Sequence, residues 1–128
     1  MFKLLYLSMK GYLILFYCNQ GLIRISSGRE FKIEEGYYVY VGSCGVSCEK
    51  RISRHLSKEK KRLHWHVDYL SQLCEPLGAI VIEKEEKEIA RKLSRLNYVK
   101  GFGSTDDKEN PSHLFKVDIK DLLSFILD

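Results

Sequence analysis

Glu86 is a candidate metal-binding residue, because its carboxylate is expected to face the interior of the protein. Ile89 and Ala90 follow it by three and four residues, so all three lie on one face of a predicted helix. A carboxylate that faces a core or a cleft has to be paired, hydrogen-bonded or bound to a metal ion. The alternative is a structural role in the first helical turn, where acidic side chains stabilise the helix dipole.

A second candidate group combines a basic helix face with two strand tyrosines. Arg51 and His55 are one helical turn apart, just after a glycine-ended strand that carries Tyr40. A guanidinium can hold two oxygens of a phosphate, and a phenol can donate to a third oxygen or act as a base. The alternative is an exposed basic helix face, with Tyr12 and Tyr40 in the core and their hydroxyls satisfied.

Basic residues are concentrated between positions 50 and 62, where seven Lys or Arg stand against one acid, Glu59. The whole chain carries 21 Lys and Arg against 17 Asp and Glu, a net charge of +4. Such a run fits an anionic partner such as DNA, and it is also typical of a helix exposed to solvent. The candidate nucleic-acid-binding residues are basic side chains of this run and the single tryptophan, which could stack on a base: Arg54, Lys58, Lys61, Arg62 and Trp65.

The next segment, His64-Trp65-His66-Val67-Asp68-Tyr69, is rich in groups that can bind a substrate. On a helix His64 and Asp68 face the same way, while Trp65 and Tyr69 stack one turn apart. The alternative is a surface ion pair beside an aromatic pair. A glycine-containing loop later in the chain, a kind of segment that often carries function, holds further candidates in or beside it: Asp106, Asp107 and His113.

Four cysteines raise the alternatives of zinc binding and disulfide formation. Cys44 and Cys48, with His64 and His66 downstream, could form a zinc site, although the paired cysteines of structural zinc sites are usually closer together. Cys18 and Cys74 lie in apolar segments and are expected to be buried thiols. The sequence leaves open whether any of the four form a disulfide.

The chain has 128 residues, which fits a single domain over residues 1–128. Its composition, 45% hydrophobic and 30% charged with no low-complexity run, excludes collagen-like and disordered classes. The longest uncharged run, from Gly11 to Ile23, is too short to cross a bilayer, and no signal-peptide cleavage site follows it. We therefore expect a cytoplasmic protein with no membrane partner.

The hydrophobic pattern predicts an α+β sandwich in which strands come first and helices follow. Alternation in the segment 37–41 places Tyr38 and Tyr40 on one face of a strand and Tyr37, Val39 and Val41 on the other. Ser47 is the predicted N-cap of the helix that follows. The expected strands span 12–18, 22–26, 31–33, 37–41, 79–82 and 114–117, and the expected helices begin after Ser47 and span 63–74, 83–97 and 119–127, with a loop over 101–112.

Short motifs in this order resemble the GIY-YIG nuclease superfamily. Gly11-Tyr12-Leu13 and Tyr40-Val41-Gly42-Ser43 resemble the two halves of its signature. Arg51-x3-His55 and Glu86-x2-Ile89-Ala90 resemble its arginine and glutamate elements. The two halves of the signature are separated by 26 residues, more than in the nucleases proper, so an extra hairpin is expected between them.

A narrower resemblance is to a GIY-YIG-like branch of unassigned function, which occurs as a stand-alone protein and fused to endonuclease III-type repair enzymes. Five segments carry this resemblance: 36–43, 54–56, 64–70, 101–106 and 112–115. The nucleases proper have nothing like the His64–Leu70 segment. The possible branch-specific site residues are therefore His64, His66, Asp68, Ser104, Asp106 and His113.

The resemblance implies a small α/β sandwich with a central, mainly antiparallel sheet flanked by helices, and a metal-dependent endonuclease acting on DNA. Glu86 would hold one Mg²⁺ or Mn²⁺ ion, and Tyr12 would act as the general base or orient it. Tyr40 and His55 would complete the catalytic group, in which Arg51 stabilises the negative charge on the phosphate. The alternative is a non-catalytic nucleic-acid-binding module of a repair system, with a DNA repair glycosylase as partner.

Overall fold

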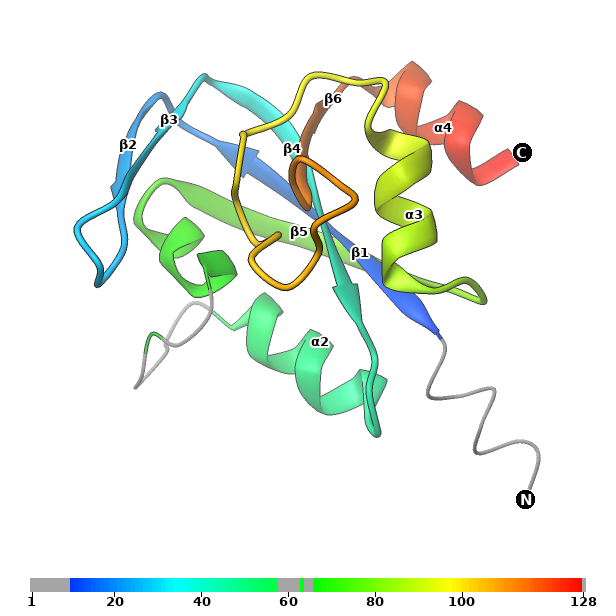
Figure 1. Cartoon of the computed structure of the whole chain (residues 1–128). Helices are drawn as coiled ribbons and strands as arrows, with labels where there is room; N and C mark the ends of the chain where they lie inside the picture. Colours follow the sequence, from blue (N-terminus) through cyan, green and yellow to red (C-terminus); the bar gives the residue numbers. More distant parts are fainter. Residues whose placement is uncertain (1–9, 58–62, 64–65, 128) are drawn as a thin grey trace.

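The computed structural model describes residues 10–57, 63 and 66–127, and these form a small α+β fold around a four-stranded antiparallel sheet (Figure 1). The strand order in the sheet is β5-β1-β4-β6, so that β1 and β4 occupy the centre. The predicted fold class is confirmed. The strands of this sheet are β1 (Gly11–Cys18), β4 (Gly36–Ser43), β5 (Cys74–Ile82) and β6 (Leu114–Val117).

The central strands are apolar on both faces, and each face builds its own core. On one face Tyr12 and Tyr40 pack with Phe102 and with residues of the 3₁₀ helix η1 (His66–Gln72). On the other face Leu13 and Val39 pack against the helix α3 (Glu86–Leu93) and the last helix, α4 (Ile119–Leu127). The predicted alternation of the tyrosines in β4 is confirmed, since Tyr38 and Tyr40 lie in the first core and Val39 and Val41 in the second.

The long segment between β1 and β4 forms a separate two-stranded hairpin. Its strands are β2 (Gly21–Arg24) and β3 (Glu30–Ile33), paired antiparallel. The hairpin extends from one end of the sheet, whereas α3 and α4 lie together at the other end (Figure 1). The extra hairpin expected between the two tyrosine motifs is therefore present.

The helix α2 (Cys48–Leu56) begins where predicted. The side chain of Ser47 accepts a hydrogen bond from the backbone N–H of Lys50 and so caps the first turn. Its apolar residues Cys48 and Ile52 pack against the first core. The helix is thereby held against the sheet face that carries Tyr12 and Tyr40, and its buried residue His55 contacts Tyr12.

The region from 63 to 82 differs from the prediction. The expected helix over 63–74 is a shorter 3₁₀ helix, η1, and β5 begins at Cys74 rather than at 79. Pro76 and Gly78 normally interrupt regular structure, but β5 is an edge strand, where the missing N–H of a proline is tolerated. The pairing of β5 with β1 is shifted by a bulge between Leu15 and Phe16. The end of this strand is partly exposed, since Val81 is 46% exposed.

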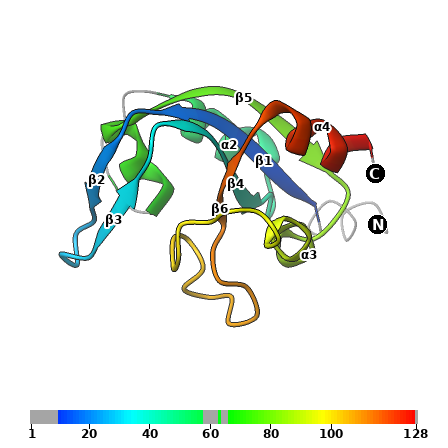
Figure 2. The same ribbon diagram turned by 90° about the horizontal axis from the view of Figure 1, so that it is seen from above.

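The helix α3 covers Glu86–Leu93 rather than the predicted 83–97. Beyond Ser94 the chain runs away from α3 (Figure 2). The loop before β6 then brings the chain back beside the start of α3. No helix in the described part of the chain is long and apolar enough to span a membrane.

All four cysteines form disulfides, so the prediction of free thiols at Cys18 and Cys74 is wrong and the alternative of a zinc site loses two of its ligands. Cys18 and Cys74, expected to be thiols, are directly opposite each other on β1 and β5 and are bonded. Cys44 and Cys48 are bonded to each other across the start of α2, which excludes them as thiolate ligands of zinc in this structure.

Candidate functional site

The motif residues meet in one cleft of about 460 Å³. Tyr12 comes from β1 and Tyr40 from β4, while the first turn of α3 contributes Glu86. Arg51 and His55 come from successive turns of α2. Five side chains that are up to 74 positions apart in the sequence therefore share a single concave surface.

Tyr12 and His55 are joined by a hydrogen bond of 2.6 Å between the phenol oxygen and Nε2. Both side chains are buried. Burial raises the pKa of Tyr12 well above its ordinary value, and the positive charge of Arg51 only partly opposes this effect. Burial likewise raises the pKa of Tyr40, so both hydroxyls are protonated at neutral pH and can donate hydrogen bonds.

Arg51 is held at the wall of the cleft by the chain that ends β4. Its Nη1 donates to the carbonyl oxygen of Ser43 at 2.8 Å. Gly45 has a φ of +57°, and a Cβ at this position would lie 2.9 Å from the Arg51 guanidinium. Glycine at 45 therefore serves both the left-handed backbone conformation and the close approach of the arginine.

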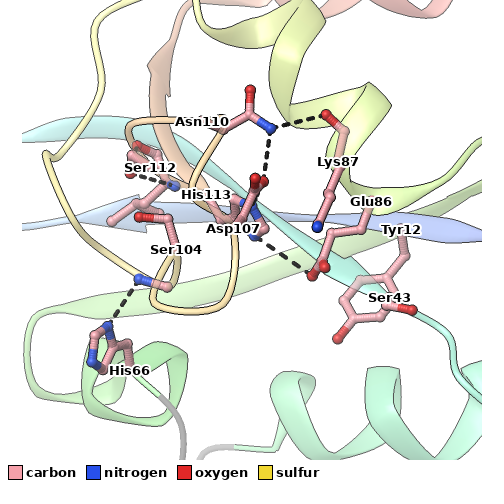
Figure 3. Close-up of polar contacts among 12 residues, drawn as sticks. Tyr12, Ser43, His66, Glu86, Lys87, Ser104, Asp107, Asn110, Ser112 and His113 are labelled. Atoms are coloured by element: carbon pink, nitrogen blue, oxygen red, sulfur yellow. Dashed lines mark hydrogen bonds and ion pairs between the residues drawn. The ribbon is translucent and has the colours of Figure 1, made fainter.

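A chain of polar contacts links Glu86 to the loop before β6 (Figure 3). His113 Nε2 lies 2.8 Å from Asp107 Oδ2, and His113 Nδ1 lies 3.5 Å from Glu86 Oε2. Asn110 Nδ2 donates to Asp107 Oδ2 at 2.7 Å and to the carbonyl oxygen of Lys87 at 3.1 Å. The loop is thereby fastened to the first turn of α3.

These contacts shift the pKa values of both members of the buried pair. Burial lowers the pKa of His113, but its contacts with Glu86 and Asp107 outweigh this effect and raise the pKa. Burial raises the pKa of Asp107, but the hydrogen bonds from His113 and Asn110 hold it below its usual value. The two groups therefore stabilise each other's charged forms.

Three of the possible branch-specific residues line the cleft. They are His113, His66 and Asp106. His66 Nδ1 accepts a hydrogen bond of 2.9 Å from the backbone N–H of Gly103, and burial followed by the charge of Arg29 lowers its pKa. Ser104 instead lies with its hydroxyl 3.4 Å from the carbonyl oxygen of Pro111, within the loop.

Asp68 is fully buried and accepts a hydrogen bond of 2.8 Å from Arg54 Nη2. The alternative of a surface ion pair in this segment does not hold for Asp68, which instead links η1 to Arg54 of α2. Arg54 also lines the cleft, so this residue is both a structural partner and a cleft residue. The remaining predicted binding residues lie outside the described residues: Lys58, Lys61, Arg62, His64 and Trp65.

Four of the described residues that line the cleft were not candidates in the sequence analysis: Ser43, Lys87, Gly103 and Thr105. Asp107 was recognised only together with its neighbour Asp106, and spacing cannot tell which of two adjacent acids turns inward. Lys87 lines the cleft next to Glu86. Its position directly after Glu86 in the predicted helix was a signal that could have been used.

The residues that could hold a metal ion are few. No group of three or more His, Cys, Asp or Glu within the described ranges is arranged to bind one. Glu86 is 29% exposed at the cleft and can offer its carboxylate to a hard cation, which often takes most of its ligands from water or substrate. A single carboxylate at the cleft thus fits a metal site that is open to water and substrate, rather than a structural site closed by protein ligands.

Comparisons with curated proteins and with solved structures give no match. The sequence model of one family, described as Domain of unknown function DUF123, matches residues 11–127. This range includes every cleft residue named above. The chain therefore belongs to the DUF123 family.

Proposed function

We propose that this protein is a GIY-YIG-like, metal-dependent endonuclease that hydrolyses phosphodiester bonds in DNA. The observation that carries the proposal is the convergence of Tyr12, Tyr40, Arg51 and Glu86 on one cleft. The order of these residues in the sequence resembles that of the superfamily, and they come from β1, β4, α2 and α3. The branch resemblance supports repair-related DNA as the substrate. It also supports a DNA repair glycosylase as a partner protein.

Hydrolysis requires that a water oxygen forms a bond to phosphorus while the bond to the leaving sugar oxygen breaks. The attacking water must lose a proton. The Tyr12 hydroxyl can accept this proton as it passes its own proton to His55 Nε2, 2.6 Å away. Because burial keeps the phenol protonated beforehand, His55 is the residue that makes Tyr12 able to act as a base.

The phosphate needs stabilisation of the negative charge that develops on its oxygens. Arg51 supplies a fixed positive charge, and its guanidinium is positioned in advance by Ser43. Tyr40 can donate a hydrogen bond from its protonated hydroxyl. Glu86 would hold Mg²⁺ or Mn²⁺, which when bound acts as a Lewis acid on the phosphate.

A non-catalytic nucleic-acid-binding module is the second candidate function. The observation that favours it is the run of seven Lys or Arg residues between positions 50 and 62. Such a module would retain DNA with Arg51 and the basic segment that follows. It predicts salt-sensitive binding that does not depend on the Glu86 carboxylate.

The test is cleavage of labelled linear, flapped, branched and abasic duplexes with Mn²⁺, with Mg²⁺ or with a chelator. Glu86→Gln is expected to lower the cleavage rate by about 100-fold or more, since a group that stabilises the transition state is lost. Glu85→Gln is the matched control, because Glu85 is exposed and makes no side-chain capping hydrogen bond.

Tyr12→Phe provides an independent variant, since it removes only the hydroxyl that contacts His55. Its control is Tyr38→Phe on the same sheet face, where the hydroxyl instead contacts the backbone of Glu34. Metal-dependent cleavage that is lost in Glu86→Gln and in Tyr12→Phe supports the proposal. DNA that is shifted but uncut, equally by wild type and Glu86→Gln, would support the binding module and overturn the nuclease.

A further inference from the structure

We propose that Glu86 and His113 together form a site for a first-row transition-metal ion such as Mn²⁺, with Asp107 as the carboxylate that orients His113. This inference rests on the proposed function only in assigning Glu86 to the metal. It adds a nitrogen ligand and a supporting carboxylate, and it thereby changes which cation the site prefers.

His113 is buried, and one of its ring nitrogens lacks a hydrogen bond. The side chain is 3% exposed, and Nδ1 makes no hydrogen bond within the part of the chain that the structure describes. The Glu86 carboxylate oxygen is 3.5 Å away, beyond the usual N–H···O range of about 2.7–3.2 Å. A buried nitrogen without a hydrogen bond is unfavourable, and a cation bound between the two residues would satisfy it.

Asp107 determines which ring nitrogen is free to bind a cation. Its Oδ2 lies 2.8 Å from His113 Nε2, and its own position is secured by Asn110 and by the backbone N–H of Glu109. A carboxylate at this distance accepts the Nε2 proton and keeps it on that nitrogen. A cation would therefore bind at Nδ1, on the side of Glu86, and would displace the Nδ1 proton to solvent (Figure 3). Carboxylate, histidine and metal ion form the same succession in many metalloproteins.

The spacing of the two donor atoms fits one shared cation. Two ligands that bind one ion at about 2.1 Å and at right angles to each other are about 3 Å apart. The separation of 3.5 Å between His113 Nδ1 and Glu86 Oε2 therefore requires only a small inward movement. Glu86 can make this movement because its side chain is 29% exposed at the cleft, whereas His113 is fixed.

The imidazole ligand decides the class of metal. Mg²⁺ is bound almost entirely by oxygen atoms, whereas first-row transition-metal ions accept imidazole nitrogen together with carboxylate oxygen. Two protein ligands leave the other coordination positions to water and to phosphate oxygens. We therefore expect Mn²⁺ to bind at least about tenfold more tightly than Mg²⁺.

A simple ion pair between an imidazolium at His113 and the Glu86 carboxylate is the competing explanation. In that case the positive ring would repel a cation, and removal of the ring would leave Mn²⁺ binding unchanged or stronger. The two explanations thus predict opposite signs for the same substitution.

The experiment is a titration of the full chain with Mn²⁺ in the absence of DNA, followed by electron paramagnetic resonance. Pulsed spectra of the wild-type complex are expected to show modulation from a bound ¹⁴N nucleus. His113→Gln should remove this modulation and weaken Mn²⁺ binding about tenfold or more, and Asp107→Asn should weaken it about 10–100-fold. The matched control is His66→Gln, because His66 also lines the cleft but its Nδ1 is engaged by Gly103.

The result that overturns the inference is the absence of ¹⁴N modulation in the wild type, its persistence in His113→Gln, or equal or tighter Mn²⁺ binding by that variant. If His113→Gln does not fold, Mn²⁺-induced broadening of the wild-type histidine ring signals decides: His113 must broaden before His66. DNA cleavage that depends on Glu86 without a ¹⁴N signal would overturn this inference alone. Binding of Mn²⁺ through His113 without cleavage of any DNA would overturn the nuclease proposal alone.

Discussion

A methyl group at Gly42 is expected to displace the candidate base, Tyr12. Gly42 on β4 is directly opposite Tyr12 on β1, and the tyrosine ring packs over it. A Cβ at position 42 would lie 2.6 Å from Tyr12 Cε1 and closer still to Cζ and the hydroxyl, nearer than the 3.0 Å below which real Cβ contacts essentially do not occur. Gly42→Ala therefore has to move the ring and break its hydrogen bond to His55.

The expected cost has two parts. Insertion of a methyl group into a filled core costs about 1–3 kcal/mol, and loss of a buried hydrogen bond costs about 0.5–1.5 kcal/mol. The backbone at Gly42 is that of an ordinary β-strand without a positive φ, so no conformational strain is added. The free energy of unfolding should therefore fall by about 1.5–4.5 kcal/mol.

Urea unfolding of Gly42→Ala and of Gly78→Ala measures this difference. Gly78 lies in β5 of the same sheet, and a Cβ there would meet no atom within 4 Å, so this control should change the free energy of unfolding by less than about 0.5 kcal/mol. Cleavage of DNA by Gly42→Ala should fall together with its stability, even at temperatures where the variant is fully folded. The reasoning is refuted if Gly42→Ala is as stable as Gly78→Ala, or if it is folded and cleaves DNA at the wild-type rate.

Two further predictions concern the loop before β6 and the link between β1 and β5. The hydrogen bond from the Gly103 N–H requires an unprotonated His66 Nδ1, and burial and Arg29 lower the pKa of His66 from its model-compound value of 6.5. The stabilisation of the folded protein by this hydrogen bond is therefore complete above about pH 6.5. It is lost as the pH falls through the lowered pKa of His66. The protection of the Gly103 amide against hydrogen exchange should decrease on acidification, and protection independent of pH between 7 and about 4.5 would contradict this. Replacement of both Cys18 and Cys74 by serine should lower the free energy of unfolding by about 4 kcal/mol, because the disulfide closes a loop with a sequence separation of 56. A urea midpoint equal to that of the wild type would contradict this prediction.

The elements that follow from neighbouring residues were predicted correctly. The segment 12–18 is apolar on both faces, and the structure places it in the centre of the sheet as β1. Ser47 caps α2 because its side chain needs only the N–H of Lys50, three residues away. Such features depend on interactions within a few residues, so the order of residues is enough to predict them.

The elements that depend on position in the sheet were predicted poorly. Pro76 and Gly78 normally interrupt regular structure, and they are tolerated in β5 only because this strand is at the edge and carries a bulge. The helix expected over 63–74 is a 3₁₀ helix because the chain has to reach the start of β5 at Cys74. Neither constraint is visible until the strand order is known.

The amino-acid sequence by itself determined the central strands, the capped helix α2 and the motif residues that meet in the cleft, because their types and spacing are local or follow the motif order. Only the tertiary structure decided which distant groups are partners. It bonds Cys18 to Cys74, pairs Arg54 with Asp68, and selects Asp107 rather than Asp106 to orient His113. The physical reason is that a disulfide, an ion pair and a hydrogen bond require contact within a few ångströms. Residues far apart in the chain reach that distance only when the sheet and the loops around it have formed.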